Sequence, residues 1–190
     1  SPEGRKELRK KILSYAQHSI SILNTMNAQG MITWDIEGQE FPHAISYVGS
    51  PDKLDQVAPE MKDIADEYFA LFKKAGFRTG ICIRPQEFIL GKKQGSARQE
   101  TVKDPAAVLI RKIKYAKNRW GCTLFYIDSN IDGAGLLMSA DVFRKVNEAV
   151  PDVLLIPEHE NPKYYEYAAP YEEMRMGAGT MAPMTLATYP

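Results

Sequence analysis

The chain has 190 residues, and its 24 Lys and Arg are balanced by 24 Asp and Glu, so its formal net charge is zero. Hydrophobic residues make up 44% and charged residues 25%, a balance that excludes intrinsic disorder as the main state. The lack of excess positive charge predicts no nucleic-acid partner, and no apolar run reaches the ~18 residues of a membrane span. The length predicts a single domain over residues 1–190.

Helical and extended patterns alternate along the chain. Short apolar stretches bounded by Gly, Pro or Asp predict strands, at 31–37, 77–84, 122–128 and 152–157. Apolar residues at helical spacing predict helices, at 5–28, 58–75, 105–120 and 140–150. Asp104 and Ser139 stand where helix N-caps are expected. We also expect a long loop over 86–103, a short helix over 162–173 and a fifth strand over 181–188.

One helix separates each predicted strand from the next, which indicates repeated βα units and a parallel sheet. All four strands are followed by charged or amide side chains. A barrel gathers every strand end around one mouth, whereas a doubly wound sheet binds its ligand at one switch point. No Gly-rich dinucleotide fingerprint follows a strand. We therefore predict an α/β fold, a (β/α)8 TIM barrel that is incomplete here, since about 200 to 250 residues are needed for eight units and this chain supplies four or five.

The strand ends predict a pair of carboxyl groups. Asp128 and Glu158 end consecutive strands, and neighbouring strands lie ~5 Å apart. Two carboxyl groups at this separation suit a retaining glycosidase, because one acts as nucleophile and the other as acid/base. Crowding also raises the pKa of one of the two groups. Other polar or aromatic residues near the strand ends are predicted to bind substrate: Trp34, Asp35, Glu37, Arg84, Asn130, His159 and Glu160.

Four segments resemble the (β/α)8 glycoside hydrolases of the alpha-amylase and alpha-galactosidase-like clans. They are Trp-Asp-Ile-Glu-Gly (34–38), Cys-Ile-Arg-Pro (82–85), Phe-Tyr-Ile-Asp-Ser-Asn (125–130) and Ile-Pro-Glu-His-Glu (156–160). The resemblance implies that Asp128 is the nucleophile at the end of a central strand and that Glu158 is the acid/base on the next. The amylase pattern carries an Arg two residues before its nucleophile, where this chain has Tyr126. The resemblance therefore indicates the fold and the reaction class rather than one family.

Two alternatives stay open on sequence grounds. A metal-dependent barrel enzyme, such as a sugar isomerase or hydrolase, would use carboxylates and an imidazole around a divalent ion: Asp35, Glu37, Asp128, Glu158 and His159. A noncatalytic sugar-binding barrel would only bind glycans through the same groups. The preferred reading predicts a carbohydrate substrate, no metal and no cofactor. Cys82 and Cys122 are expected to be buried free thiols. The start at Ser1-Pro2 and the end at Tyr189-Pro190 suggest a chain cut at one or both ends, so any targeting signal would be lost from it.

Overall fold

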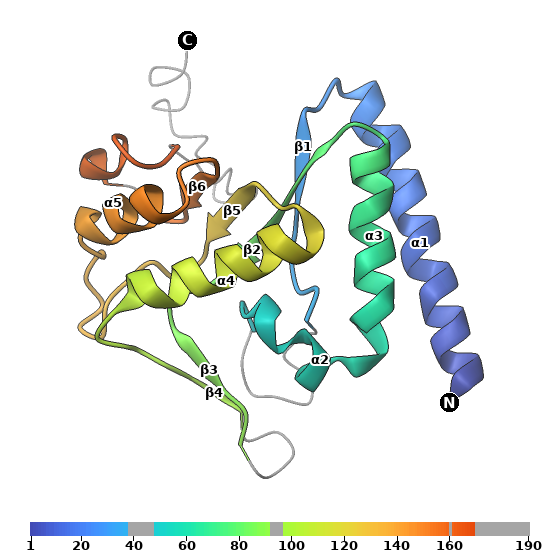
Figure 1. Ribbon diagram of the computed structural model, residues 1–190, viewed down its shortest axis with the longest axis horizontal. Coiled ribbons are helices and arrows are strands. Elements are labelled where there is room, and N and C mark those ends of the chain that lie inside the picture. The colour runs from blue at the N-terminus through green and yellow to red at the C-terminus, as the bar shows by residue number, and fades with distance from the viewer. Residues whose placement is uncertain (38–47, 92–96, 160, 170–190) are drawn as a thin grey trace, which may run out of the picture.

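A four-stranded parallel sheet forms the centre of the molecule in the computed structural model (Figure 1), which describes residues 1–37, 48–91, 97–159 and 161–169. Its strands run in the order β1-β2-β5-β6, the order of the chain. Their bounds are Gly30–Thr33 for β1, Arg78–Ile83 for β2, Leu124–Ile127 for β5 and Leu154–Pro157 for β6. The alternation of strands and helices therefore predicted the sheet correctly, because parallel neighbours require a crossover helix.

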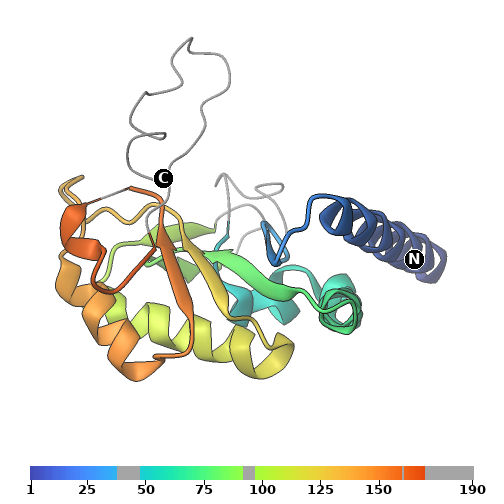
Figure 2. The same cartoon turned by 90° about the horizontal axis from the view of Figure 1, so that it is seen from above.

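Three helices cover one face of this sheet: α3 (Lys62–Lys74), α4 (Pro105–Trp120) and α5 (Ala140–Ala149). Figure 2 shows α4 and α5 together on that side of the strands. The strand residues that meet the helices are buried and aliphatic or aromatic: Ile81, Ile83, Phe125, Ile127 and Leu155. Helix α1 (Pro2–Thr25) lies beside α3 instead, at the margin of the sheet.

The opposite face of the sheet carries a thinner apolar layer. Cys82 and Tyr126 are buried there, and Ile32 and Ile156 are only partly covered. Leu154, at the amino end of β6, keeps 43% of its surface exposed. In a closed barrel this face would line the interior, so the described sheet corresponds to an opened segment of barrel.

Capping residues fix the ends of α4 and α5. The Asp104 carboxylate accepts a hydrogen bond from the Ala107 amide at 3.1 Å, and the Ser139 hydroxyl accepts one from the Asp141 amide at 3.3 Å. Gly121 ends α4 with a φ of 70°, a left-handed conformation that glycine adopts without strain. Both predicted N-caps are confirmed.

Several predicted boundaries are corrected. The helix predicted from residue 58 is a 3-10 turn, Pro59–Met61, followed by α3, and a further 3-10 turn (Pro51–Lys53) and α2 (Leu54–Val57) precede it. The loop expected over 86–103 contains an antiparallel hairpin, β3 (Glu87–Ile89) with β4 (Arg98–Glu100). The helix expected from residue 162 is a 3-10 turn, Pro162–Tyr164. The predicted fifth strand lies outside the described residues.

The first strand is shorter than predicted, and this changes the geometry of its acidic pair. Strand β1 ends at Thr33, and Asp35 has a φ of 54°, so the chain turns before Glu37. A strand over 31–37, as predicted, would place Asp35 and Glu37 on one face, and the structure shows that this arrangement is wrong. Side-chain alternation holds only while the backbone stays extended.

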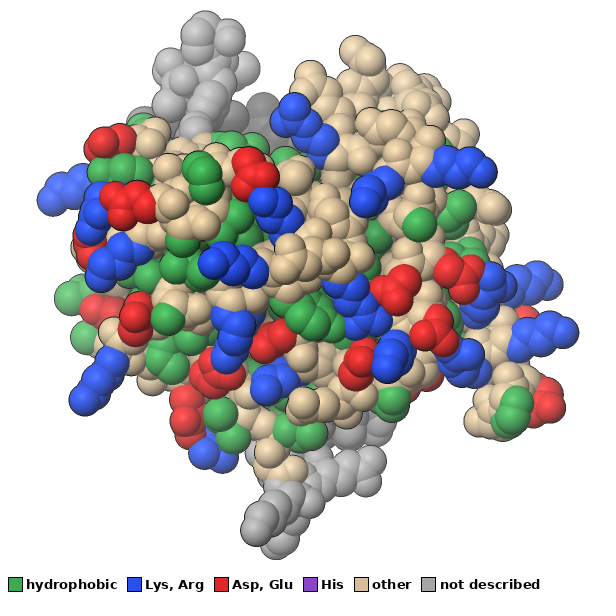
Figure 3. All heavy atoms as spheres, viewed as in Figure 1, with side chains coloured by type: hydrophobic (Ala, Val, Ile, Leu, Met, Phe, Trp, Pro, Cys, Tyr) green, Lys and Arg blue, Asp and Glu red, His purple; other side chains and the backbone are tan. Residues whose placement is uncertain are grey.

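Charged side chains of both signs are interspersed over the face of the molecule seen in Figure 3. Ion pairs join α1 to α3, as between Arg5 and Asp63 at 3.0 Å, and Arg119 of α4 reaches Asp66 of α3 at 2.7 Å. Among the described helices, none combines the length and the apolar character that crossing a bilayer requires. Cys82 and Cys122 are buried thiols, as predicted.

Candidate active site

The carboxyl ends of β2, β5 and β6 bring Arg84, Asp128 and Glu158 together. Register pairs Cys82 with Tyr126, and Tyr126 with Ile156, on the thinly covered face of the sheet. The three charged residues follow that row by two positions each. The Asp128 amide donates to the Ile83 carbonyl at 2.9 Å and the Glu158 amide donates to the Ile127 carbonyl at 3.0 Å. The ladder thus continues to these residues, and alternation puts their side chains on the same face.

The three side chains form a connected charged group. The Arg84 guanidinium donates through Nε to Asp128 Oδ2 in an ion pair, and both side chains keep only 12% and 15% of their surface exposed. Glu158 Oε2 accepts a hydrogen bond from the Ser129 amide at 2.7 Å and lies 3.5 Å from Nε2 of His159. The predicted proximity of Asp128 and Glu158 follows from the pairing of β5 with β6.

Burial raises the pKa of Glu158, and the hydrogen bond and negative charge of Asp128 raise it further. The Ser129 amide and His159 oppose this rise. The same site therefore contains one carboxyl group held by an arginine and a second one that keeps its proton to higher pH. This is the asymmetry that a nucleophile and a general acid require.

Ser129 and Asn130 shape the turn that follows β5. Ser129 has a φ of 55°, and its amide donates a hydrogen bond to Glu158. The Asn130 side chain is fully buried, donates to the His159 carbonyl at 2.9 Å and accepts from the His159 amide at 2.7 Å. Asn130 was expected to bind substrate hydroxyls, but its amide is engaged with backbone and it holds the β6 turn in place instead.

Trp34 lies at the open side of the same edge. Its side chain is 48% exposed, and its ring packs against that of Tyr126 with centroids 4.7 Å apart. Strand β1 ends at Thr33, directly before Trp34, and the ring contact is what places Trp34 beside the row of Cys82 and Tyr126. The site therefore has an exposed aromatic surface beside its carboxyl groups.

Glu37 is fully buried, which differs from its expected contact with substrate. Its Oε1 accepts a hydrogen bond from the Ser50 amide, while Oε2 has no hydrogen-bond partner among the described residues. Burial raises the pKa of Glu37 to about 7, opposed by its hydrogen bonds and by the charge of Lys112. Glu37 therefore stabilises the loop segment around Ser50 and does not reach a ligand at the surface.

Lys112 is the main residue that sequence reasoning missed. Its position on α4 lies between Val108 and Ala116 at spacings of four, so it belongs to the buried stripe of the helix. Its side chain is fully buried, and this burial lowers its pKa to about 8. The helical spacing itself carried the signal, because a lysine between two buried positions has no direct route to solvent.

Solved structures with a similar fold include alpha-amylases. A noncanonic maltogenic alpha-amylase from Thermotoga neapolitana matches with a TM-score of 0.57 and 12% identity, over 84% of this chain and 44% of that one. A maltogenic amylase from S. marinus matches with a TM-score of 0.55 and 14% identity, over 80% of this chain and 32% of that one. The alpha-amylase of Geobacillus thermoleovorans complexed with acarbose matches with a TM-score of 0.53 and 10% identity, over 80% of this chain and 42% of that one. The chain has the fold of part of an alpha-amylase-type barrel. The predicted fold class is thereby confirmed.

This chain spans less than half of the length of each of these amylases. No family model and no curated protein matches its sequence. In a barrel of this type the ligand site lies at the carboxyl ends of the strands. That is the edge where Arg84, Asp128 and Glu158 meet.

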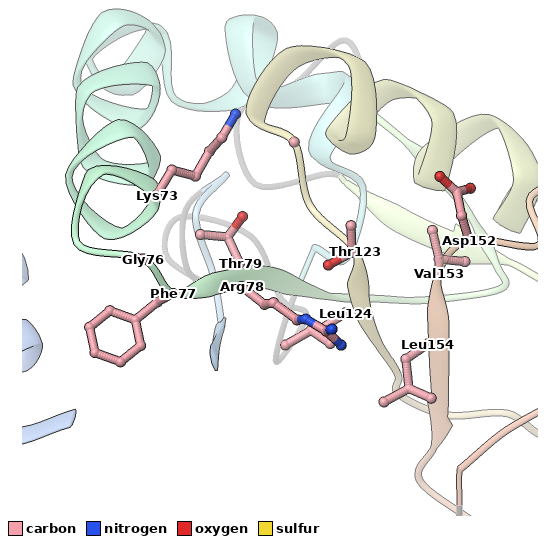
Figure 4. A pocket seen from close by; sticks show the side chains of 11 residues that line it. Lys73, Gly76, Phe77, Arg78, Thr79, Thr123, Leu124, Asp152, Val153 and Leu154 are labelled. Atoms are coloured by element: carbon pink, nitrogen blue, oxygen red, sulfur yellow. The ribbon is translucent and has the colours of Figure 1, made fainter. Parts of the chain in front are cut away.

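A hollow of about 610 Å³ lies at the other edge of the sheet, where the strands begin. Figure 4 shows Lys73, Arg78 and Asp152 around it, with Thr79 of β2 and Thr123, directly before β5, between them. The bottom of a barrel serves stability rather than catalysis, so we place the site at the carboxyl edge.

The remaining predicted residues complete the description. Glu160 lies outside the described residues, whereas His159 is half-exposed beside Glu158. Asp35 occupies the turn after β1 in a left-handed conformation. Among the residues that the structure describes, no group of three or more His, Cys, Asp or Glu is arranged to hold a metal ion.

Proposed function

We propose that the protein is a glycoside hydrolase that cleaves a glycan with retention of configuration. The observation that carries the proposal is the contact between Asp128 and Glu158 on adjacent strand ends, with Arg84 on one carboxyl group and a raised pKa on the other. The alpha-amylase folds that this chain resembles support the same reaction class. An inverting pair needs a wider gap of about 6.5 to 9.5 Å for a water molecule between its carboxyl groups.

Asp128 is the proposed nucleophile. Its carboxylate attacks the anomeric carbon as the bond from that carbon to the leaving oxygen breaks, which forms a covalent glycosyl ester. Arg84 fixes the orientation of this carboxylate through its ion pair. Ordered side chains of this kind lower the entropy cost of reaching the transition state.

Glu158 is the proposed acid/base. In the first step its proton goes to the leaving oxygen, and in the second step the resulting carboxylate removes a proton from the water that hydrolyses the ester. The hydrogen bond from the Ser129 amide fixes one carboxylate oxygen during both steps.

Trp34 is the proposed platform for a sugar ring, because about half of its surface is exposed and its ring packs against Tyr126. Asp35, His159 and Glu160 are proposed to contact sugar hydroxyls. Asn130 and Glu37 contribute by holding the backbone of the two neighbouring loops.

The direct test is hydrolysis of soluble starch and of a panel of 4-nitrophenyl glycosides by the full chain and its variants. We expect Asp128→Asn and Glu158→Gln to lose at least ~1000-fold in kcat/KM, as removal of a covalent or acid/base group does. The matched controls Asp63→Asn and Glu60→Gln change carboxylates on the exposed surface around α3 and should keep full activity. The anomer released first, followed by proton NMR, reports retention.

Full activity of Asp128→Asn would overturn the assignment. Release of the opposite anomer would replace the retaining mechanism with an inverting one. Glycan binding by calorimetry without any product on prolonged incubation would identify a noncatalytic sugar-binding barrel.

A further inference from the structure

Lys112 is a lysine in the core of the protein. A buried ammonium group loses its hydration, so it is tolerated only where each of its protons has an acceptor. The described structure provides three acceptors, all backbone carbonyls: Gly49 at 2.9 Å, Arg84 at 2.7 Å and Gln86 at 2.8 Å from Nζ. All three donors of the ammonium group are therefore used.

These carbonyls belong to two different loops. Gly49 lies in the segment after β1, whereas Arg84 and Gln86 directly follow β2. A single ammonium group from α4 thus joins the segment around Gly49 to the end of β2, next to the candidate site. A neutral side chain of the same length would supply none of these bonds.

Close packing at the same junction restricts Arg84. The Arg84 amide donates to the Gly49 carbonyl at 3.1 Å. A Cβ atom on Gly49 would lie 2.9 Å from both N and Cγ of Arg84, and the φ of Gly49 is 59°. Only glycine allows the loop to approach this closely.

The guanidinium group leaves this junction toward the site. Its Nη1 donates to Gln99 Oε1 at 2.9 Å, and Gln99 in turn donates to the Val48 carbonyl at 3.1 Å. Its Nε donates to Asp128. Lys112 thus binds the backbone carbonyl of Arg84. The guanidinium group of Arg84 binds Gln99 of β4 through Nη1 and the Asp128 carboxylate through Nε.

We propose that Lys112 is a positioning residue that holds the Arg84 guanidinium against Asp128 by joining the loop at 48–50 to the end of β2. The inference deepens the proposed glycosidase function and rests on it for the importance of Asp128. Lys112 itself contacts no substrate. It acts only through the backbone carbonyls that it binds.

The test compares Lys112→Met, Arg84→Gln and the double variant, with Lys114→Met on the exposed side of α4 as the control. The first readout needs no substrate: the titration of the Glu158 side-chain carboxyl, followed by carbon-13 NMR. Loss of the arginine from Asp128 removes the cation that compensates this carboxylate, while His159 beside Glu158 stays in place, so the Glu158 midpoint should move to higher pH. We expect this move in Lys112→Met and in Arg84→Gln, no larger move in the double variant, and none in Lys114→Met.

A folded Lys112→Met variant that loses stability but keeps the wild-type Glu158 titration would overturn the proposal, because a purely structural lysine would behave in that way. Additive moves in the double variant would overturn it as well. If Lys112→Met does not fold, Gly49→Ala is used instead, because its added Cβ would displace Arg84 while Lys112 is intact. This variant should move the Glu158 midpoint in the same direction. Gly133→Ala, whose added Cβ meets nothing closer than 3.6 Å, is its control. An unchanged Glu158 midpoint in a folded Gly49→Ala variant would then overturn the proposal that the Gly49 segment positions Arg84.

The second readout is kinetic. Where the wild-type chain hydrolyses a glycoside, Lys112→Met should lower kcat by on the order of 10- to 100-fold, with a smaller effect on KM, as misplaced catalytic groups do. If the wild-type chain hydrolyses nothing, the proposed function fails, and the titration alone still decides the role of Lys112.

Discussion

At the scale of single residues, burial decides the behaviour of Glu37. Its pKa is about 7, raised from 4.5 chiefly by burial, so the folded state binds the proton more tightly than the unfolded chain does. The stability from this proton is complete below pH ~4.5 and is lost as the pH rises through 7, a change on the order of 3 kcal/mol. We expect the free energy of unfolding of Glu37→Gln, minus that of wild type, to increase between pH 4.5 and pH 8.

Urea unfolding at pH 4.5, 6 and 8 measures this difference. The control is Glu60→Gln, an exposed carboxylate whose substitution should shift stability equally at all three values. A difference between Glu37→Gln and wild type that does not vary with pH would contradict the assignment.

The residues of the site were predictable to different degrees. Asp128, Glu158 and Arg84 could be predicted to meet because each one directly follows a strand, and strand ends of a parallel sheet converge. The contacts of Asn130 and Glu37 could not, because whether a polar group near a strand end faces solvent depends on the loop that packs over it. The Ser50 amide that bonds Glu37 is 13 residues away in the chain.

At the scale of elements, α4 depends on its N-cap. The Asp104 carboxylate accepts from the Ala107 amide, and Pro105 occupies the first turn, where its missing N–H is tolerated. We expect Asp104→Ala to lower the free energy of unfolding by ~1 kcal/mol, because one backbone donor loses its partner. Asp104→Ser, whose hydroxyl also caps, should lose much less. Equal losses in the two variants, measured by denaturant unfolding, would show that the cap contributes nothing.

Local signals of this kind explain which elements were predictable. The helices α4 and α5 have an amphipathic stripe and a cap within a few residues, so their sequences identify them. The β3–β4 hairpin was missed because its pairing joins Glu87 to Glu100 across a 13-residue separation and each strand has only three residues. Strand β1 was predicted to be too long because no sequence signal marks the left-handed turn at Asp35.

At the scale of the whole molecule, the regular alternation of strands and helices was enough to predict the parallel sheet and its order. It could not specify which of the two faces is thickly covered. The helices pack on the face of Leu155, whereas Leu154 faces the opposite side, which would line the interior of a closed barrel. These two leucines are neighbours on β6 and differ 43% to 1% in exposure.

Substitutions of these two leucines therefore test whether the sheet face that carries Leu154 is exposed in solution. Leu155→Ala removes a buried side chain packed among the helices and should lower the free energy of unfolding by about 2 to 5 kcal/mol. Leu154→Ala, in the same strand and with the same loss of atoms, should cost within ~0.5 kcal/mol, because 43% of its surface is already in water. Denaturant unfolding of both variants gives the comparison. A cost for Leu154→Ala as large as that for Leu155→Ala would mean that this face is covered in solution, since a side chain in water leaves no cavity when it is removed.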